Sequence, residues 1–229
     1  MKAAARARRG IPVVLAIIAL AAVSSPSASV VEVEVQIPMS EKIDTTGMVR
    51  LLVGGFRSGS HPSVDLDTET IDALRSLLHK NTRFEVLNVE TMPLPEQPLD
   101  DAIRNTAYWK RLSQRYNADL IIGGTVDFVA TDESGFMDQD YISDLTGHRQ
   151  RQTVWVERES FKMDLRLYFF RGATGELLYE DAFSESQMFI GKGNDDLTIL
   201  HDLIEAVGEG ILSILVPRTR TETRYLFTE

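Results

Sequence analysis

The stretch that most constrains the fold of this chain is residues 117–129, NADLIIGGTVDFV. It contains an apolar run, two adjacent glycines and a short alternation in which Val126 and Phe128 flank Asp127. Continuous apolar character of this length, with β-branched residues, is typical of a strand that is covered on both faces. We therefore predict that residues 117–129 form the central strand of a layered sheet.

The first 29 residues have a different composition from the rest of the chain. Four basic residues, Lys2, Arg6, Arg8 and Arg9, precede an apolar run at residues 11–23, and small residues follow. This is the form of a secretory signal peptide, because a membrane-spanning helix needs about 20 apolar residues. We predict a signal peptide at residues 1–29 and a periplasmic or otherwise exported protein. The alternative is an uncleaved N-terminal membrane anchor, and the exact cleavage site stays open.

Charge and cysteine content narrow the classes of partner. Without the four basic residues of the signal peptide, 20 basic and 34 acidic residues remain, so the mature chain carries a net charge of about −14. Such a charge repels phosphate backbones and anionic lipid headgroups. We therefore expect no nucleic-acid partner and at most a peripheral association with membranes. The chain contains no cysteine, which excludes disulfides, thiolate metal ligands and a lipid-modified cysteine after the signal peptide.

Periodicity predicts a single α/β domain at residues 30–217. Strands and helices alternate with short connections, so we expect right-handed crossovers and a mixed sheet of about five or six strands with helices packed on it. The predicted strands lie at residues 30–37, 48–56, 84–89, 117–129, 151–157, 161–170 and 176–186. The predicted helices run from Asp65 or Asp67 to Lys80, from Asp100 or Asp101 to Tyr116, and from a cap at residues 194–196 to Pro217.

Three features refine this plan. Residues 131–150 are polar and read as an insertion, a loop or extension of about 20 residues, which in a compact domain is usually functional or disordered. Residues 218–229 alternate and predict a C-terminal edge strand or arm. Gly208 and Gly210 weaken an isolated helix by about 1 kcal/mol each, so the last helix is predicted to pack against the sheet.

No pattern of catalytic, cofactor-binding or metal-ligating residues stands out, and we assign none. The histidines His61, His79, His148 and His201 are far apart and lack zinc-site spacing, which favours surface or cap roles. The sequence Gly191-Lys192-Gly193-Asn194 lacks the remainder of a phosphate-binding loop and predicts a simple turn. Asp138, Asp140 and Asp144 could bind calcium, but they lack the spacing of an EF-hand, so a solvated acidic segment is the preferred interpretation. Ser58 and Ser60 read as turn residues rather than nucleophiles.

Aromatic residues concentrate in the C-terminal strands, and most are predicted to lie in the core. They are Trp155, Phe161, Phe169, Phe170, Tyr179 and Phe183. Because Tyr168, Phe169 and Phe170 are consecutive, their side chains point to both faces of the sheet. At least one of these aromatics is therefore expected to meet either the last helix or a partner.

Several phrases resemble a group of exported α/β modules that comprises the TolB N-terminal domain, the curli secretion protein CsgG and the penicillin-binding-protein activator LpoB. The matching residues are VEVQIPMSEKID, RLLVGGF, RFEVLNV, YNADLIIGGTVDF and TGELLYEDAF, spread over residues 33–216. The resemblance implies a non-enzymatic binding module of the periplasm or outer membrane. It transfers no functional residue, because the group carries no catalytic motif.

We therefore expect a non-catalytic binding or assembly module of the bacterial cell envelope, acting through contacts with an envelope protein whose identity the sequence does not give. Its expected working surfaces are residues 131–150 and the exposed edges of strands at residues 30–37 or 218–229. A homo-oligomer is compatible with this interpretation. One alternative is a secretion-pore subunit like CsgG, although residues 131–158 are highly charged for membrane-crossing strands. A periplasmic hydrolase with scattered carboxylates is a weaker alternative.

Overall fold

The computed structural model describes residues 29–90, 92, 94–144 and 147–228. The predicted signal peptide lies outside the described residues except for Ser29. Two compact units are present, and each is described by itself: residues 37–220 form the larger unit, and residues 29–36 with 221–228 belong to the smaller one.

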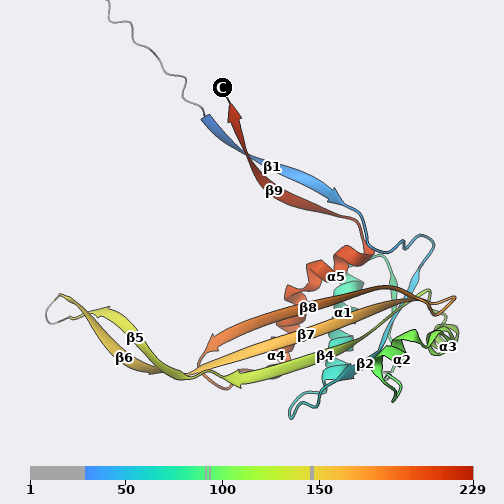
Figure 1. Ribbon diagram of the computed structural model, residues 1–229, viewed down its shortest axis with the longest axis horizontal. Coiled ribbons are helices and arrows are strands. Elements are labelled where there is room, and N and C mark those ends of the chain that lie inside the picture. The colour runs from blue at the N-terminus through green and yellow to red at the C-terminus, as the bar shows by residue number, and fades with distance from the viewer. Residues whose placement is uncertain (1–28, 91, 93, 145–146, 229) are drawn as a thin grey trace, which may run out of the picture. The chain divides into compact units, whose positions relative to one another are not determined.

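A five-stranded mixed sheet organises the larger unit, in the order β3-β2-β4-β7-β8 (Figure 1). The strands are β2 (Arg50–Ser58), β3 (Glu85–Leu87), β4 (Leu120–Asp132), β7 (Arg158–Arg171) and β8 (Leu177–Ile190). Strands β3 and β4 are parallel to β2, whereas β7 is antiparallel to both β4 and β8. The predicted central strand is thus confirmed as β4, and the predicted mixed α/β sheet is confirmed with five strands.

Two hydrophobic cores cover the two faces of β4, because neighbouring side chains of a strand point to opposite sides. Leu120 and Ile122 belong to the larger core, beneath α1 (Leu66–Asn81), α4 (Asp196–Ala206) and α5 (Gly208–Leu215). Ile121 belongs to the smaller core, beneath α2 (Leu99–Arg104) and α3 (Thr106–Tyr116). Each of these three β4 residues is fully buried.

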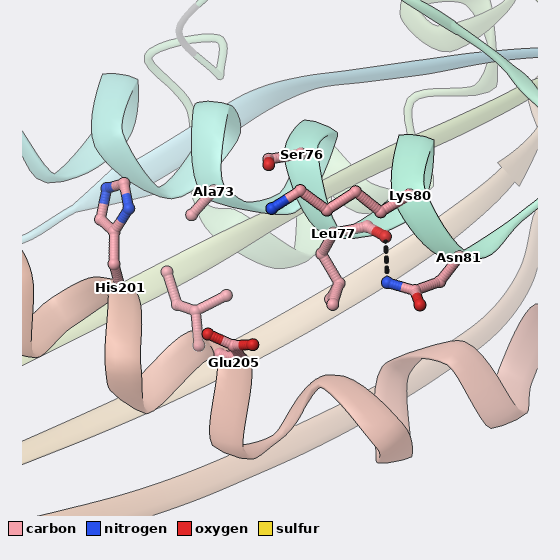
Figure 2. Close-up of a pocket in the computed structure, with 8 residues that line it drawn as sticks. Ala73, Ser76, Leu77, Lys80, Asn81, His201 and Glu205 are labelled. Atoms are coloured by element: carbon pink, nitrogen blue, oxygen red, sulfur yellow. Dashed lines mark hydrogen bonds between the residues drawn. The ribbon is translucent and has the colours of Figure 1, made fainter.

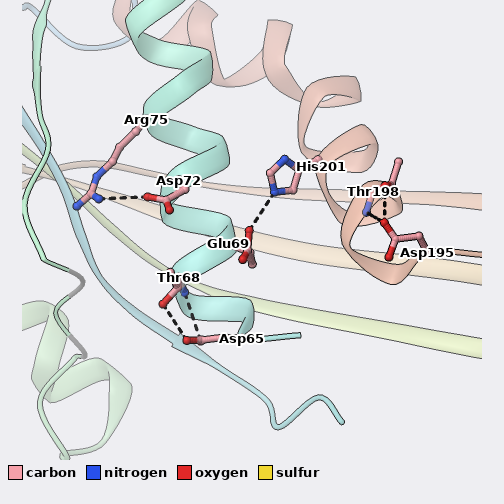
Figure 3. Close-up of polar contacts among 8 residues, drawn as sticks. All are labelled: Asp65, Thr68, Glu69, Asp72, Arg75, Asp195, Thr198 and His201. Carbon is pink, nitrogen blue, oxygen red and sulfur yellow. Dashed lines mark hydrogen bonds and ion pairs between the residues drawn. The ribbon is translucent and has the colours of Figure 1, made fainter. Parts of the chain in front are cut away.

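Local sequence signals explain where the helices begin. Asp65 accepts a hydrogen bond from the Thr68 amide at the start of α1, and Asp195 accepts one from the Thr198 amide at the start of α4 (Figure 3). Both are N-caps that satisfy amides with no partner inside the helix. The predicted caps at Asp65 and Asp195 are therefore confirmed.

Two predicted helices are each divided in two. The helix predicted from Asp100 or Asp101 to Tyr116 breaks at Asn105, whose side chain caps α3 by accepting from the Tyr108 amide. The predicted single C-terminal helix breaks at Val207, between α4 and α5. Packing fits this break, since a Cβ on Gly208 would lie only 3.0 Å from Cδ1 of Leu77 on α1. Gly210 lies equally close to Phe183 of β8, so the expected packing of this helix onto the sheet is confirmed.

The buried face of α3 is centred on one tryptophan. Trp109 is almost fully buried together with Leu112, whereas Tyr108 and Tyr116 are only partly buried. The Trp109 indole stacks on Phe170 with ring centroids 3.8 Å apart, and its Nε1 donates to the Ala102 carbonyl. Trp109 therefore joins α2, α3 and β7 in one cluster.

The consecutive aromatics of β7 are all buried, as alternation requires. Tyr168 and Phe170 lie in the smaller core and Phe169 in the larger core, where the last helices pack. The predicted contact of at least one of them with the C-terminal helical segment is thus met by Phe169, and none of the three is available to a partner.

Strand β1 (Ser29–Met39) pairs with β9 (Arg218–Thr228) as a two-stranded sheet, most of which belongs to the smaller unit and whose arrows run in opposite directions in Figure 1. Residues 30–37 and 218–229 were expected to present free edges. Their mutual pairing occupies one edge of each strand within the described part of the chain.

Candidate functional site

Five exposed large apolar or aromatic side chains, Phe136, Met137, Tyr141, Ile142 and Trp155, lie on a β-hairpin between β4 and β7. Its strands are β5 (Gly135–Ile142) and β6 (Arg149–Val156), paired antiparallel from Gly135↔Val156 to Ile142↔Arg149. We call residues 135–156 the hairpin arm. Figure 1 shows it continuing from the end of the β4–β7 pair, beyond the helices that cover the sheet.

Of the two forms expected for the polar insertion, a loop or an extension, the structure shows an extension. The range 131–150 comprises the end of β4, all of β5 and the first residues of β6, so the described part of the range is mostly paired strand. The polarity that suggested a loop results from side chains that pair with each other across the two strands. Asp138 accepts from Thr153 at 2.7 Å, and Tyr141 donates to Gln150 at 3.0 Å.

One face of the hairpin arm combines aromatic, charged and aliphatic groups. The register places Phe136 opposite Trp155, and their rings meet edge to face with centroids 5.0 Å apart. Phe136 is 75% exposed and Trp155 56% exposed. Trp155 is therefore an exception to the expectation that most of the C-terminal aromatics lie in the core.

The charged residues of this face neutralise each other. Asp140 pairs with Arg149 at 3.0 Å and with Arg151 at 3.1 Å. Further along, Ile142 is 71% exposed beside the turn. The three acidic residues weighed as calcium ligands, Asp138, Asp140 and Asp144, are not brought together: the first two are engaged by Thr153 and the arginines, and Asp144 lies exposed in the turn.

The base of the hairpin arm is fixed to the body by polar contacts. Lys192 donates to Asp132 at 2.6 Å, and the Ser134 amide donates to the same carboxylate at 2.9 Å. These hydrogen bonds, with that of Lys192 as the largest cause, hold the pKa of Asp132 well below its ordinary value. Residues 191–194 thus form a simple turn, as predicted, and its Lys192 anchors the arm.

A second anchor lies on the neighbouring strand. Glu159 of β7 accepts from the Asn194 side chain at 2.8 Å, and the Asn194 and Gly193 amides also point to this carboxylate. The hydrogen bond from the Asn194 side chain is the largest cause of a lowered pKa at Glu159. Asp132 and Glu159 face each other in the last β4–β7 pair, so both strands that enter the arm are held.

The four histidines are not brought together. His61 lies against the Phe128 ring, His148 follows the turn of the arm, and His79 lies on α1. His201 of α4 lies 3.4 Å from a Glu69 oxygen of α1, as Figure 3 shows. Among the described residues no group of three or more metal-ligating side chains is found. Ser58 ends β2, and Ser60 lies in the loop after it.

A small cavity between α1 and α4 is one of several concave features of the described residues (Figure 2). Its volume is about 140 Å³, whereas sites for small molecules usually enclose several hundred. Leu77 and Ala73 line it together with Lys80, His201 and Glu205. The Asn81 amide at its margin donates to the Leu77 carbonyl at 2.8 Å, within its own helix.

Comparisons with known proteins match only solved structures. No family model matches the sequence, and no curated protein does so. PelC from Paraburkholderia phytofirmans, a dodecamer, is 12% identical with a TM-score of 0.38, over 82% of this chain and 99% of that one. The LpoB C-terminal domain from Salmonella enterica is 11% identical with a TM-score of 0.36, over 64% and 89%. Lipoprotein GNA1162 from Neisseria meningitidis is 15% identical with a TM-score of 0.37, over 72% and 98%.

These solved structures include a domain of LpoB, which belongs to the group named in the sequence analysis. Because their TM-scores lie below 0.5, the likenesses carry no functional argument. None of the helices in the described part of the chain has both the length and the apolar character needed to span a bilayer.

Sequence reasoning located the region of the arm but missed its key residues. Phe136 was not singled out, and Trp155 was named only within a group of aromatics of which most were expected in the core. A signal was present: Phe136, Met137, Val154 and Trp155 lie at mirrored positions around the turn, as expected for cross-strand partners in a hairpin.

Proposed function

We propose that this chain is an exported, non-catalytic protein-binding module of the bacterial cell envelope, and that its binding surface is the hairpin arm. The single observation that carries the choice of surface is the exposed Phe136–Trp155 pair on a rigidly anchored hairpin. Large aromatic side chains dominate the binding energy of protein interfaces, because they bury much apolar area at low entropic cost.

The envelope location is supported by the basic and apolar pattern of residues 1–29 and by the resemblance to exported modules. Fractionation of the cells and the mass of the mature protein test it. We expect a periplasmic or envelope-bound chain that begins near residue 30. A cytosolic chain that retains residues 1–23 would contradict export.

The arm is tested with a double substitution, Phe136→Ser with Trp155→Ser, in the full-length chain. Both side chains are exposed, so the fold should be unchanged while stable partners no longer copurify. The matched control is Val49→Ser with Leu197→Ser, which removes exposed apolar side chains outside the arm. Equal partner recovery from the arm variant and the control would refute the arm as binding surface.

A secretion-pore subunit fits the arm less well. The strands of the arm have eight residues each, fewer than the 9–11 of membrane-crossing strands, and they carry the charged residues Asp140, Arg149 and Arg151. Extraction distinguishes the two proposals: a binding module is released by salt or osmotic shock, whereas a pore subunit needs detergent.

A further inference from the structure

The outer edge of β8 is a long free strand edge in the larger unit. Strand β8 has 14 residues and ends the five-stranded sheet, and no further strand among the described residues pairs with it. Such an edge presents unpaired amides and carbonyls, which are a template for adding another strand. The opposite edge of the sheet, β3, has only three residues.

The direction of the β8 amides follows from its pairing with β7. The Gly191 amide donates to the Glu157 carbonyl, and the β7–β8 register runs without a shift from Arg158↔Ile190 to Phe169↔Tyr179. Odd-numbered residues of this stretch therefore direct their backbone groups to β7, and even-numbered residues direct theirs to the free edge. Ala182 and Ser186 are thus among the residues with outward amides.

Two of these outward amides donate hydrogen bonds to acidic side chains of β8 itself. The Ala182 amide donates to Oδ1 of Asp181 at 2.9 Å, and the Ser186 amide donates to Oε1 of Glu185 at 3.3 Å. In each case the carboxylate belongs to the preceding residue. An added strand would have to displace both carboxylates, so each acts as a local block on the edge.

The sequence of β8 is compatible with pairing to itself. In an antiparallel pair of two β8 strands, outward residues face outward residues, and a two-fold axis at Ser184 aligns residues 178–190. This register places Ala182 opposite Ser186, so the two blocked amides would belong to the same backbone pair. Opposite side chains would be Leu178 with Ile190, Tyr179 with Phe189 and Asp181 with Gln187. No two like charges oppose each other, and the ends of the pair are apolar.

From these observations we infer that the outer edge of β8 is a self-pairing surface for a second copy of this chain, held closed by the side chains of Asp181 and Glu185. The interface is isologous. When the two carboxylates release the edge, pairing of the two β8 strands joins two five-stranded sheets into one. This inference does not depend on the function of the hairpin arm. Its consequence is that the two carboxylates decide whether the chain is a monomer or a dimer.

The test compares three double variants of the chain without residues 1–29, by light scattering after gel filtration at one protein concentration. Asp181→Ala with Glu185→Ala removes both blocks, and we expect a molar mass twice that of the monomer. Asp181→Asn with Glu185→Gln keeps an oxygen acceptor in each side chain, and we expect the mass of the monomer. Glu176→Ala with Glu180→Ala removes the same charge without removing a block, and we also expect the monomer.

Each outcome is decisive. A monomeric alanine variant would overturn the inference. Dimers of the Asn/Gln variant or of the Glu176/Glu180 control would show that charge alone is responsible, which also overturns it. If the alanine variant loses its β-sheet circular dichroism, Asp181→Val with Glu185→Val replaces it, because valine favours strands.

A cysteine cross-link tests the register. Because the chain lacks cysteine, Ser184→Cys in the alanine variant introduces a unique thiol at the expected two-fold axis, where a disulfide between copies should form. The control Ser186→Cys lies opposite Ala182 and should cross-link much less. Equal cross-linking of both variants would contradict the proposed register.

Discussion

The indole ring of Trp109 lies directly on the backbone of Gly123. A Cβ at Gly123 would lie 2.8 Å from Cη2 of Trp109 and 3.0 Å from the Gly55 carbonyl oxygen. A side chain of α3 thus contacts the backbone of the sheet at glycines of two neighbouring strands, β2 and β4. This contact explains Gly55 and Gly123, which leave space for a large aromatic ring between α3 and the sheet.

We expect Gly123→Ala to destabilise the protein by about 1–3 kcal/mol, because the added methyl group overpacks a site with backbone on one side and a stacked indole on the other. Urea unfolding followed by circular dichroism measures the change. Gly135→Ala is the control, since a Cβ there meets no atom within 4 Å. Similar unfolding midpoints for both variants would contradict the packing.

The two tryptophans of the chain should report opposite environments. Trp109 is 1% exposed and Trp155 56% exposed. We expect Trp155→Phe to shift the fluorescence emission to shorter wavelength and to remove most quenching by acrylamide. Trp109→Phe should have the opposite effects. A quencher-resistant Trp155 would show that the base of the hairpin arm is covered.

Asp119 joins the starts of β2 and β4. Its Oδ2 accepts from the Val49 and Arg50 amides, each at 2.9 Å. Asp119→Ala leaves both amides without this acceptor, and we expect a loss of about 1–3 kcal/mol in the free energy of unfolding. Asp119→Asn keeps one oxygen acceptor and should lose less. Equal losses for the two variants would argue against this role.

The contact between Asp132 and Lys192 predicts a pH dependence of stability. The pKa of Asp132 is lowered in the folded state, so its contribution is present above the ordinary carboxyl pKa of about 4 and is lost as the pH falls from there toward the folded value. Asp132→Asn should therefore be less stable than wild type at neutral pH, with the difference shrinking below about pH 4.

Urea unfolding between neutral and acidic pH measures this difference. Lys192→Met serves as the second arm of the comparison, because the double variant should lose little more than either single variant if the two groups act as a pair. A constant difference between wild type and Asp132→Asn across the acidic range would contradict the pair.

The central strand was predictable because burial on both faces leaves a continuous apolar run that needs no knowledge of the partners. The caps Asp65 and Asp195 were predictable for a similar reason, since an N-cap acts within its own first turn. The breaks at Asn105 and Val207 were not predictable from periodicity, because an apolar stripe continues across each break. The break at Val207 fits contacts with distant residues, such as Gly208 against Leu77.

At the candidate site, too, features that depend on residues distant in the sequence could not be predicted. Its polar residues suggested a loop, because pairs such as Asp138 with Thr153 and Asp140 with Arg151 satisfy each other only once the register is known. Trp155 was grouped with aromatics that were mostly expected in the core, because alternation predicts that one face of a strand is buried. Alternation does not reveal that the strand extends past the helices that would cover it.

Photo-crosslinking in living cells of the source organism tests the central claim most directly. A photoreactive amino acid replaces Phe136 in the full-length chain, and Leu197 on α4, also exposed, is the matched control position. We predict a discrete crosslinked adduct with an envelope protein from position 136 and none from position 197. If position 136 gives no adduct, or only the adducts seen at position 197, the hairpin arm is not the binding surface.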